Sequence, residues 1–419
     1  MRIGTGGVVG ALGLLLAAAA SADVLTVPAG GDRLAETLRT ASAGDVLVLA
    51  AGRHAGPLTI DKAVTLRGRP GAVVEGSGEG STLRIVAPGV TVERLRITGS
   101  GLSLEGMDAG VFVSKKGTGA RIIGNRIVDN LYGVHLKGSA NAVVKDNEIV
   151  GRRDLRVNER GNGVSLWNAP GAVVDGNRIR YGRDGVFVTT SKRNRFTNNR
   201  FRDLRIAVHY MYADDSVVAG NLSEGNYVGY ALMYSKRLKV FDNRSFADRH
   251  HGILLNFANR SEIRGNWVRD GEEKCVFIYN SSRNTFARNR FEGCAIGVHF
   301  TAGSEANAIA ENAFIANRTQ VKYVGTRHLD WSADGRGNFW SDNAAFDLDG
   351  DGIADVAYRP NDLADKVLWA HPRAKLLLNA PSLRLLALAQ GQFPALHPGG
   401  VIDTAPLMTA PAMPGAGQR

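Results

Sequence analysis

Short apolar runs of three to six residues recur through the middle of the chain, and polar turns separate them. One asparagine stands at the same place in every repeat, between two such runs, at successive intervals of 22, 30, 22, 22, 22, 23, 23 and 23 residues. A regular period in this range is typical of a repeat architecture. The series consists of Asn125, Asn147, Asn177, Asn199, Asn221, Asn243, Asn266, Asn289 and Asn312.

Each repeat contains three apolar runs. One run precedes the asparagine, one follows it, and a third lies eight or nine residues further on, as in 133–136 and 252–255. No repeat contains the longer amphipathic segment that a helical or leucine-rich repeat needs. We therefore predict an all-β chain folded as a right-handed parallel β-helix, with three short strands in each coil of about 22–23 residues. The asparagines would form a hydrogen-bonded ladder from coil to coil, or simply mark turns.

The repeat sets the expected domain boundaries. Residues 1–22 resemble a signal peptide, with an apolar stretch from Val8 to Ala20, although an uncleaved anchor is the alternative. Residues 23–57 would form an N-terminal cap with a helix over 32–43, and 58–324 the β-helix. Residues 325–380 would form an Asp/Gly-rich cap, and 381–419 a C-terminal helix and a disordered tail. That helix, over 382–392, is too short to span a bilayer, but it could lie on a membrane or dock into a membrane partner.

The long interval between Asn147 and Asn177 contains about eight extra residues. An insertion in a solenoid forms a loop on one face, often the binding face. Four arginines in this insertion suit an acidic partner, although a solvated loop is the alternative; they are Arg152, Arg153, Arg156 and Arg160. The net charge of +11 also favours acidic partners or anionic surfaces. Basic runs interleaved with aromatic residues are missing, so nucleic-acid binding is not expected.

The third strand of each coil alternates between core-facing aliphatic residues and a second set that must face outward. This second set is rich in aromatic residues, Met and His, and such a surface marks a partner or ligand site, unless a loop or the C-terminal tail covers it. We call these residues the outward strip: Phe112, His135, Trp167, Phe187, His209, Met211, Met233, Leu254, Phe277, Tyr279 and His299. Trp167, Phe187, Phe277 and Tyr279 are the expected partner contacts.

Three residues of the outward strip suit copper. His209 and Met211 share a face, and Met233 should stack one coil away from Met211. Thioether and imidazole groups together are ligands that Cu(I) prefers. Plain packing is the alternative.

Right-handed β-helices include polysaccharide enzymes, so Asp214–Asp215 and His250–His251 need attention. Counted from the preceding asparagine of the series, the two aspartates lie at offsets 15 and 16 and the two histidines at 7 and 8. They should therefore lie on different strands or corners, whereas paired catalytic carboxylates sit ~5–9.5 Å apart. We expect no enzymatic activity; a polysaccharide lyase, epimerase or carbohydrate-binding protein is the alternative.

Two further features concern metal and redox chemistry. Asp347, Asp349, Asp351 and Asp355 match ligand positions of a calcium loop, but Tyr358 stands where an EF-hand has Glu, so a structural calcium and a rigid Asp–Gly turn are both open. Cys275 and Cys294 lie at offsets 9 and 5 from their preceding asparagines. Stacking alone would not bring them within bonding reach, so we predict no disulfide, although an exported chain could form one.

Several stretches resemble the NosD family, and generic β-helix carbohydrate repeats lack them. They run from mid-chain almost to the end: 152–162, 209–212 (His-Tyr-Met-Tyr), 229–235, 274–280, 299–305, 318–325 and 337–342.

The resemblance implies a non-enzymatic periplasmic protein that sits on an ABC transporter built from the permease NosY and the ATPase NosF. Members help to build the copper–sulfide CuZ site of nitrous oxide reductase, NosZ, with the copper chaperone NosL as a further partner. The family is described as copper-binding, but no agreed ligand set carries over, so His209, Met211 and Met233 rest on register alone. The permease would be the partner of the C-terminal helix and would associate the chain with the membrane.

Overall fold

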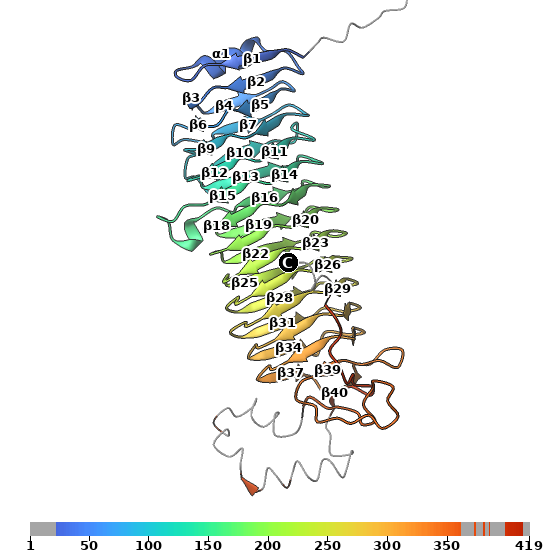
Figure 1. Cartoon of the computed structure of the whole chain (residues 1–419). Coiled ribbons are helices and arrows are strands. Elements are labelled where there is room, and N and C mark those ends of the chain that lie inside the picture. The colour runs from blue at the N-terminus through green and yellow to red at the C-terminus, as the bar shows by residue number, and fades with distance from the viewer. Residues whose placement is uncertain (1–21, 362–372, 374–379, 382–384, 386–398, 414–419) are drawn as a thin grey trace, which may run out of the picture.

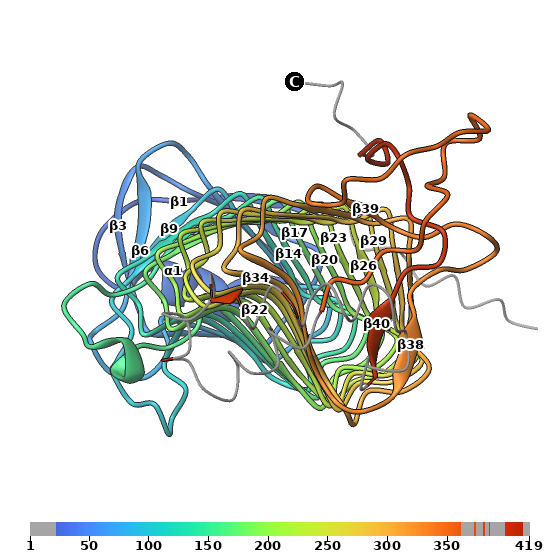
Figure 2. The ribbon, with the colours of Figure 1, turned by 90° about the horizontal axis from the view of Figure 1, so that it is seen from below.

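Three parallel sheets, which run the length of a single rod, form the molecule (Figure 1). The computed structural model describes residues 22–361, 373, 380–381, 385 and 399–413. Each coil contributes one strand to each sheet, in the order A, B, C, and the next coil begins again in sheet A. Seen along the axis, the three sheets are the walls of one tube (Figure 2). The predicted right-handed parallel β-helix is confirmed.

The strands of each sheet follow one another in chain order. Sheet A contains β1 (Val24–Val27), β2 (Val46–Leu49), β5 (Thr65–Gly68), β8 (Thr91–Glu93), β11 (Arg121–Ile123), β14 (Val143–Lys145), β17 (Val173–Asp175), β20 (Arg195–Thr197), β23 (Val217–Ala219), β26 (Lys239–Phe241), β29 (Glu262–Arg264), β32 (Thr285–Ala287) and β35 (Ala308–Ala310). Sheet B contains β3 (Gly52–Ala55), β6 (Ala72–Glu75), β9 (Arg96–Thr98), β12 (Arg126–Val128), β15 (Glu148–Val150), β18 (Arg178–Arg180), β21 (Arg200–Arg202), β24 (Leu222–Glu224), β27 (Arg244–Phe246), β30 (Trp267–Arg269), β33 (Arg290–Glu292), β36 (Ala313–Ile315) and β39 (Phe339–Trp340). Sheet C contains β4 (Leu58–Ile60), β7 (Leu83–Ile85), β10 (Ala109–Val113), β13 (Tyr132–Lys137), β16 (Val164–Trp167), β19 (Asp184–Thr189), β22 (Ile206–Met211), β25 (Val228–Met233), β28 (His251–Asn256), β31 (Lys274–Tyr279), β34 (Ile296–Thr301) and β37 (Thr319–Val324).

Stacking in register makes the core continuous. Ile122, Ile127 and Val134 of one coil pair with Val144, Ile149 and Val164 of the next, one pair in each sheet. All six side chains are buried in one cluster that extends through the stack. Because every coil offers the same apolar positions to its neighbours, burial accumulates along the rod, as expected of a solenoid.

The asparagine series forms a ladder at the corner between sheets A and B. The side-chain amide of Asn125 donates to Oδ1 of Asn147 at 3.1 Å, and the same contact recurs along the whole series. It continues beyond Asn312 to Asn338 at 3.0 Å and ends on the buried carboxylate of Asp403. The left-handed turn residue is the one before the asparagine, such as Asp146 at φ 54°, so the buried asparagine itself serves hydrogen bonding.

The helix α1 (Arg33–Thr40) covers the N-terminal end of the core. It is shorter than the predicted 32–43, and its buried Leu34 and Leu38 place it against β1 and β3. The predicted signal peptide over 1–22 lies outside the described residues, except for its last residue. Among the described residues, no helix is long and apolar enough to cross a bilayer.

Stacked aromatic rings close the C-terminal end of the core. The rings of Phe314 and Trp340 lie 4.3 Å apart, and the Trp331 ring packs beside both. Strand β38 (His328–Asp330) pairs with β40 (Gly400–Ile402), and the chain then returns along sheet B. Residues 410–413, which we expected to be disordered, line a cavity of about 390 Å³ beside Trp267. Most of the predicted C-terminal helix over 382–392 lies outside the described residues.

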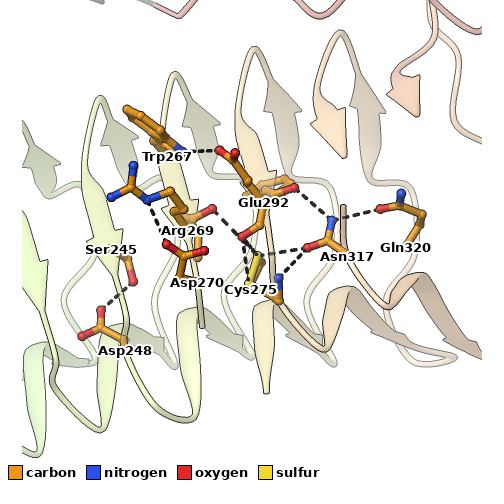
Figure 3. Close-up of a disulfide and its surroundings, with 12 residues drawn as sticks. Ser245, Asp248, Trp267, Arg269, Asp270, Cys275, Glu292, Asn317 and Gln320 are labelled. Carbon is orange, nitrogen blue, oxygen red and sulfur yellow. Dashed lines mark hydrogen bonds and ion pairs between the residues drawn. A yellow bond between two sulfur atoms is a disulfide. The ribbon is translucent and has the colours of Figure 1, made fainter. Parts of the chain in front are cut away.

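The prediction that Cys275 and Cys294 stay unpaired is wrong. They form a disulfide with their Cα atoms 5.7 Å apart (Figure 3). Cys275 takes the second position of its sheet C strand, where most other coils have glycine. A Cβ atom at the equivalent Gly297 would lie 3.0 Å from the Asn317 amide at the corner of the next coil. This position therefore faces the next coil's corner residue, and Cys294 is the corner residue that faces Cys275.

Candidate functional site: the outward face of sheet C

One column of the outward strip runs along sheet C, with the residue of each coil in register with that of the next. Strand pairing aligns Phe187 with His209, and Phe277 with His299, as neighbours on adjacent coils. Their rings touch, with centroids 5.0 Å and 4.7 Å apart. Ala231 and Leu254 occupy the same column between these two pairs. The face is therefore a single surface of apolar, aromatic and imidazole groups.

Exposure along the strip is uneven. Trp167 is 48% and Tyr279 41% exposed, whereas Phe112 and His135 are buried. The insertion explains the buried end, because its Leu155 packs against a cluster that contains Phe112. A second buried cluster on this face, separate from the main core, consists of Ile206, Val228 and Ala231, with Leu254 packed against it.

Contacts within the insertion engage most of its arginines. It contains a short 3₁₀ helix, η1 (Val157–Glu159). The Arg152 guanidinium forms an ion pair with Asp154, and Arg160 donates to the Leu155 carbonyl at 2.9 Å. The Arg153 guanidinium lies 4.2 Å from the centre of the Tyr181 ring. Arg156 is exposed, so it is the member of the four that is most available to a partner.

The structure brings two of the three candidate copper ligands side by side. Met211 and Met233 are register partners on β22 and β25, and both are partly exposed. His209 lies two residues before Met211 on the same face of the strand. The two methionines, which occupy the same position in successive repeats, are therefore neighbours in the fold.

Sequence reasoning missed the residues that hold His209. Its Nδ1 lies 2.9 Å from a carboxylate oxygen of the buried Asp184, which also receives two hydrogen bonds from Arg205 at 2.8 and 2.7 Å. Burial raises the pKa of Asp184, but the hydrogen bonds from His209 and Arg205 outweigh it, so that the pKa is lowered overall. An ionised carboxylate can only accept, so Nδ1 of His209 is the donor and Nε2 is the nitrogen left to face a metal, as in many metal sites.

Asp184 could have been found from the strand alignment. It stands at the first position of its sheet C strand, where the following coils have Ile206 and Val228. A buried carboxylate beside such apolar neighbours requires a buried partner. Arg205 lies directly before that column on the next coil and supplies the charge.

Two histidines of the strip, His135 and His299, are neutral at pH 7. Burial, with a smaller contribution from Lys137, lowers the pKa of His135 to about 4. Burial and then the charges of Lys322 and Lys274 lower the pKa of His299 to about 4. A neutral imidazole keeps a lone pair for a metal or a hydrogen bond, so His135 and His299 add no positive charge to this face.

The aspartates and histidines that we weighed as signs of a polysaccharide enzyme do not come together. His251 begins β28, in register with Val228 and Ile206, whereas Asp214 follows the opposite end of β22. The Asp215 carboxylate is paired with Arg237. Burial is the main cause that lowers the pKa of His251, to about 3, so this imidazole is also neutral at pH 7.

An aromatic column in the turns after sheet C was not predicted. The rings of Tyr212, Tyr234 and Phe257 stack at 5.3 and 5.2 Å, and each residue has a positive φ. They line an open cavity of about 510 Å³ together with Lys192 and Asp214. Left-handed φ values cost free energy for bulky residues, so no backbone preference selects aromatic residues here.

Three of the four calcium-loop aspartates converge. Carboxylate oxygens of Asp347, Asp349 and Asp351 lie within 4.8 Å of one another, whereas Asp355 accepts the Leu348 N–H at 2.8 Å. Both Asp347 oxygens accept backbone N–H groups, and that of Gly352 is the main cause of the lowered pKa of Asp347. Tyr358 is not a ligand, because its hydroxyl donates to Asp342 and its ring packs on Trp340.

Fold and face together define a β-helical binding scaffold, with an imidazole- and thioether-bearing surface on one sheet. The family model described as "Periplasmic copper-binding protein (NosD)" matches residues 145–345. A probable ABC transporter binding protein NosD from Pseudomonas aeruginosa is 44% identical over 377 residues, which cover 87% of this chain and 88% of that protein. Its namesake from Stutzerimonas stutzeri is 42% identical over 377 residues, 87% of this chain and 86% of that protein. The chain belongs to the NosD family, as its sequence indicated.

Solved structures share the fold only. The family 28 exopolygalacturonase of Yersinia enterocolitica is 10% identical, with a TM-score of 0.53 over 73% of this chain and 77% of that enzyme. At this identity the likeness carries no argument about activity.

Proposed function

We propose that this chain is a periplasmic accessory subunit of an ABC transporter, built from the permease NosY and the ATPase NosF. It docks partner proteins and aids copper insertion into the CuZ site of nitrous oxide reductase, NosZ, with NosL as the copper donor. The names of its relatives and the description of its family support the transporter association, the copper chemistry and the periplasmic location.

One observation carries the copper part of this proposal. Met211 and Met233 are register partners, and His209 on the same face is oriented through its Nδ1 by Asp184. Two thioethers and one imidazole suit Cu(I), and the partial exposure of the methionines allows transfer to and from a partner.

Titration of the purified chain with Cu(I) against a competing chelator tests this site. The wild type should bind one ion at the strip, and the His209→Ala/Met211→Ala/Met233→Ala variant should not bind it. A matched control carries His328→Ala and Met408→Ala, which remove the same kinds of group in the C-terminal region. A wild-type chain that binds no Cu(I), or a triple variant that binds it as tightly, would overturn the copper assignment.

The docking part rests on two exposed aromatic residues of the strip, Trp167 and Tyr279, which lie in the register column of Met211 and Met233, one on each side of that pair. Trp167→Ala and Tyr279→Ala should each weaken capture of the chain by the purified NosY–NosF complex, because exposed aromatic side chains are frequent anchors of interfaces. Phe346→Ala is the matched control, since Phe346 is 50% exposed but lies outside the strip. Equal capture of all three variants would place the contact elsewhere.

We propose further that Asp347, Asp349 and Asp351 hold a structural calcium ion. Their convergence supports it, and calcium prefers carboxylate oxygens. Calcium should then raise the melting temperature relative to chelator, and Asp349→Asn should abolish the difference. The same melting temperature with and without calcium would leave a rigid Asp–Gly turn as the explanation of the motif.

A further inference from the structure

Two adjacent histidines and a glutamate meet at the edge of sheet C where its strands begin. His250 is the corner residue before β28, and His251 is the first residue of that strand. Glu273 holds the same corner position one coil later, directly before β31, because His251 pairs in register with Lys274. The fold thus stacks Glu273 on His250 and presents His251 beside them.

The possible ligand atoms of the three side chains lie close together. His250 Nδ1 is 2.8 Å from His251 Nε2, and His250 Nε2 is 3.6 Å from a Glu273 carboxylate oxygen. One ligand atom from each residue can be chosen so that all three lie within 4.8 Å of one another. Stacking of imidazole and carboxylate on successive coils is what brings the group together.

One polar atom of this cluster has no protein partner. His251 is 5% exposed, and its Nδ1 is buried without a hydrogen bond among the described residues. Nε2, which faces His250, is therefore the His251 nitrogen that is placed to bind an ion at the open side of the cluster. The other side of the cluster is open, since the side chains of His250 and Glu273 are 31% and 49% exposed. An ion from solvent can therefore reach the cluster without a change of fold.

Neighbouring rings hold both imidazoles. The His250 ring lies against Tyr227 with centroids 4.9 Å apart, and the His251 ring lies 5.4 Å from Phe277. The backbone of His250 is fixed on both sides, because its N–H donates to Tyr227 and its carbonyl accepts from Lys274. Side chains fixed in this way lose little entropy when an ion binds.

The ligand set selects a class of metal. Two imidazoles and a carboxylate with an open position are typical of Zn²⁺ and Cu²⁺, whereas Cu⁺ prefers thiolate and thioether groups. The 2.8 Å gap between the two histidines is shorter than the ~3.3 Å expected between two ligands ~2.0 Å from a tetrahedral ion. The more exposed His250 ring therefore has to shift by a few tenths of an ångström when an ion binds.

We propose that His250, His251 and Glu273 form a binding site for a borderline divalent ion, Cu²⁺ or Zn²⁺. It lies on the same face as His209, Met211 and Met233 but uses none of them. The buried cluster around Val228 separates the two groups of residues. The inference is therefore independent of the proposed Cu(I) site, and one can fail without the other.

One cation opposes the site. The Lys274 ammonium lies 2.7 Å from a Glu273 carboxylate oxygen and competes with a metal ion for that carboxylate. Removing this charge while keeping the length of the side chain should therefore strengthen metal binding. If the cluster is a metal site, Lys274→Met should raise the metal affinity. A merely structural cluster predicts a change of the opposite sign.

The experiment is calorimetric titration of the full-length exported chain with Cu²⁺ and, separately, Zn²⁺. We expect one site per chain, with Cu²⁺ the tighter ligand, as the usual order of divalent affinities requires. Replacing an outer partner of a metal ligand costs about 10–100-fold in affinity, so loss of a ligand in His250→Ala should cost about 100-fold or more. Glu273→Gln should weaken binding, and Lys274→Met should tighten it.

Controls separate this site from others on the chain. The His209→Ala/Met211→Ala/Met233→Ala variant should bind Cu²⁺ at this site as tightly as the wild type, and His328→Ala, which removes an exposed histidine elsewhere, should do the same. Electron paramagnetic resonance of the Cu²⁺ complex should show two imidazole nitrogens in the wild type and one in His250→Ala. Because His250 is exposed, that variant should keep its fold, which circular dichroism checks. Absence of binding, or an affinity that His250→Ala and Glu273→Gln leave unchanged, would overturn the proposal.

Discussion

Asp248 is a buried carboxyl group that should destabilise the native chain at neutral pH. It lies at the corner before β28, where one oxygen accepts the Asn226 N–H at 2.8 Å and the other accepts the Ser245 hydroxyl at 2.5 Å (Figure 3). Burial raises its pKa from 3.8 to about 6, although the hydrogen bonds from Ser245, Ser223 and Asn226 oppose the rise. The nearby charge of Glu224 raises it further.

Because the pKa of Asp248 is raised in the folded chain, the direction in which stability changes with pH is fixed. The folded chain holds the proton more tightly than the unfolded chain, so stability is highest below pH 3.8 and falls as the pH rises towards 6. Each unit of pKa shift is worth about 1.4 kcal/mol, so the ionised group costs up to about 3 kcal/mol above pH 6. Asp248→Asn removes the titration. One coil earlier, Asn226 already donates to the Ser223 hydroxyl at 2.8 Å, so an amide fits this corner.

Urea unfolding of the wild type and Asp248→Asn at several pH values between 4 and 7 measures the effect. The free energy of unfolding of the variant, minus that of the wild type, should be near zero at pH 4 and grow to about 2–3 kcal/mol at pH 7. Asp203→Asn, at an exposed turn, is the control for the change from carboxylate to amide and should alter the free energy of unfolding at pH 7 by less than Asp248→Asn does. A difference for Asp248→Asn that is constant from pH 4 to 7, or a wild type that is more stable at pH 7, would refute the reasoning.

Three further predictions concern the scaffold and the strip. Cys275→Ala/Cys294→Ala, or reduction of the wild type, should lower the free energy of unfolding by about 2–4 kcal/mol, measured in urea, because the bond closes a loop of 19 residues; no loss would mean that the bond does not constrain the unfolded chain. Asn221→Ala removes an acceptor and a donor from the buried ladder and should lower the free energy of unfolding by about 2–4 kcal/mol in the same assay. Asn158→Ala, at an exposed position, is the control and should lower it by less than about 0.5 kcal/mol. Equal losses would show that the ladder does not stabilise the fold. Asp184→Asn should weaken Cu(I) binding at the strip about 10–100-fold in a chelator competition, and unchanged affinity would show that its imidazole partner is not a ligand.

The repeat and the ladder could be predicted from sequence because their signal is local. Each coil repeats the same apolar positions around an asparagine such as Asn221, and the period alone indicates the stacking. The pairing of Met211 with Met233 follows from the same count. Wherever the backbone keeps the strand register, residues with equal offsets become neighbours.

The disulfide, the burial of Phe112 and the end of the ladder could not be predicted, because they depend on contacts that the repeat spacing does not specify. The disulfide was missed because the second position of each sheet C strand faces the next coil's corner, so residues with unequal offsets meet. Burial of Phe112 depends on how the insertion folds back, and the position of Leu155 is not periodic. The end of the ladder was missed because Asp403 lies 65 residues beyond the Asn338 whose N–H it accepts.

The direction of the ladder has a consequence for how the chain is made. One N–H of each ladder amide donates to a backbone carbonyl of the preceding coil, and the other donates to the asparagine of the following coil, which emerges later from the ribosome. If folding starts at the N-terminus, the last folded coil therefore has one amide N–H without its acceptor. A buried unpaired group of this kind costs about 1–3 kcal/mol of free energy. Asp403, the last acceptor, lies 65 residues beyond Asn338, so the ladder stays open until this C-terminal segment is made. A chain that lacks Asp403 therefore leaves the N–H of Asn338 without this acceptor.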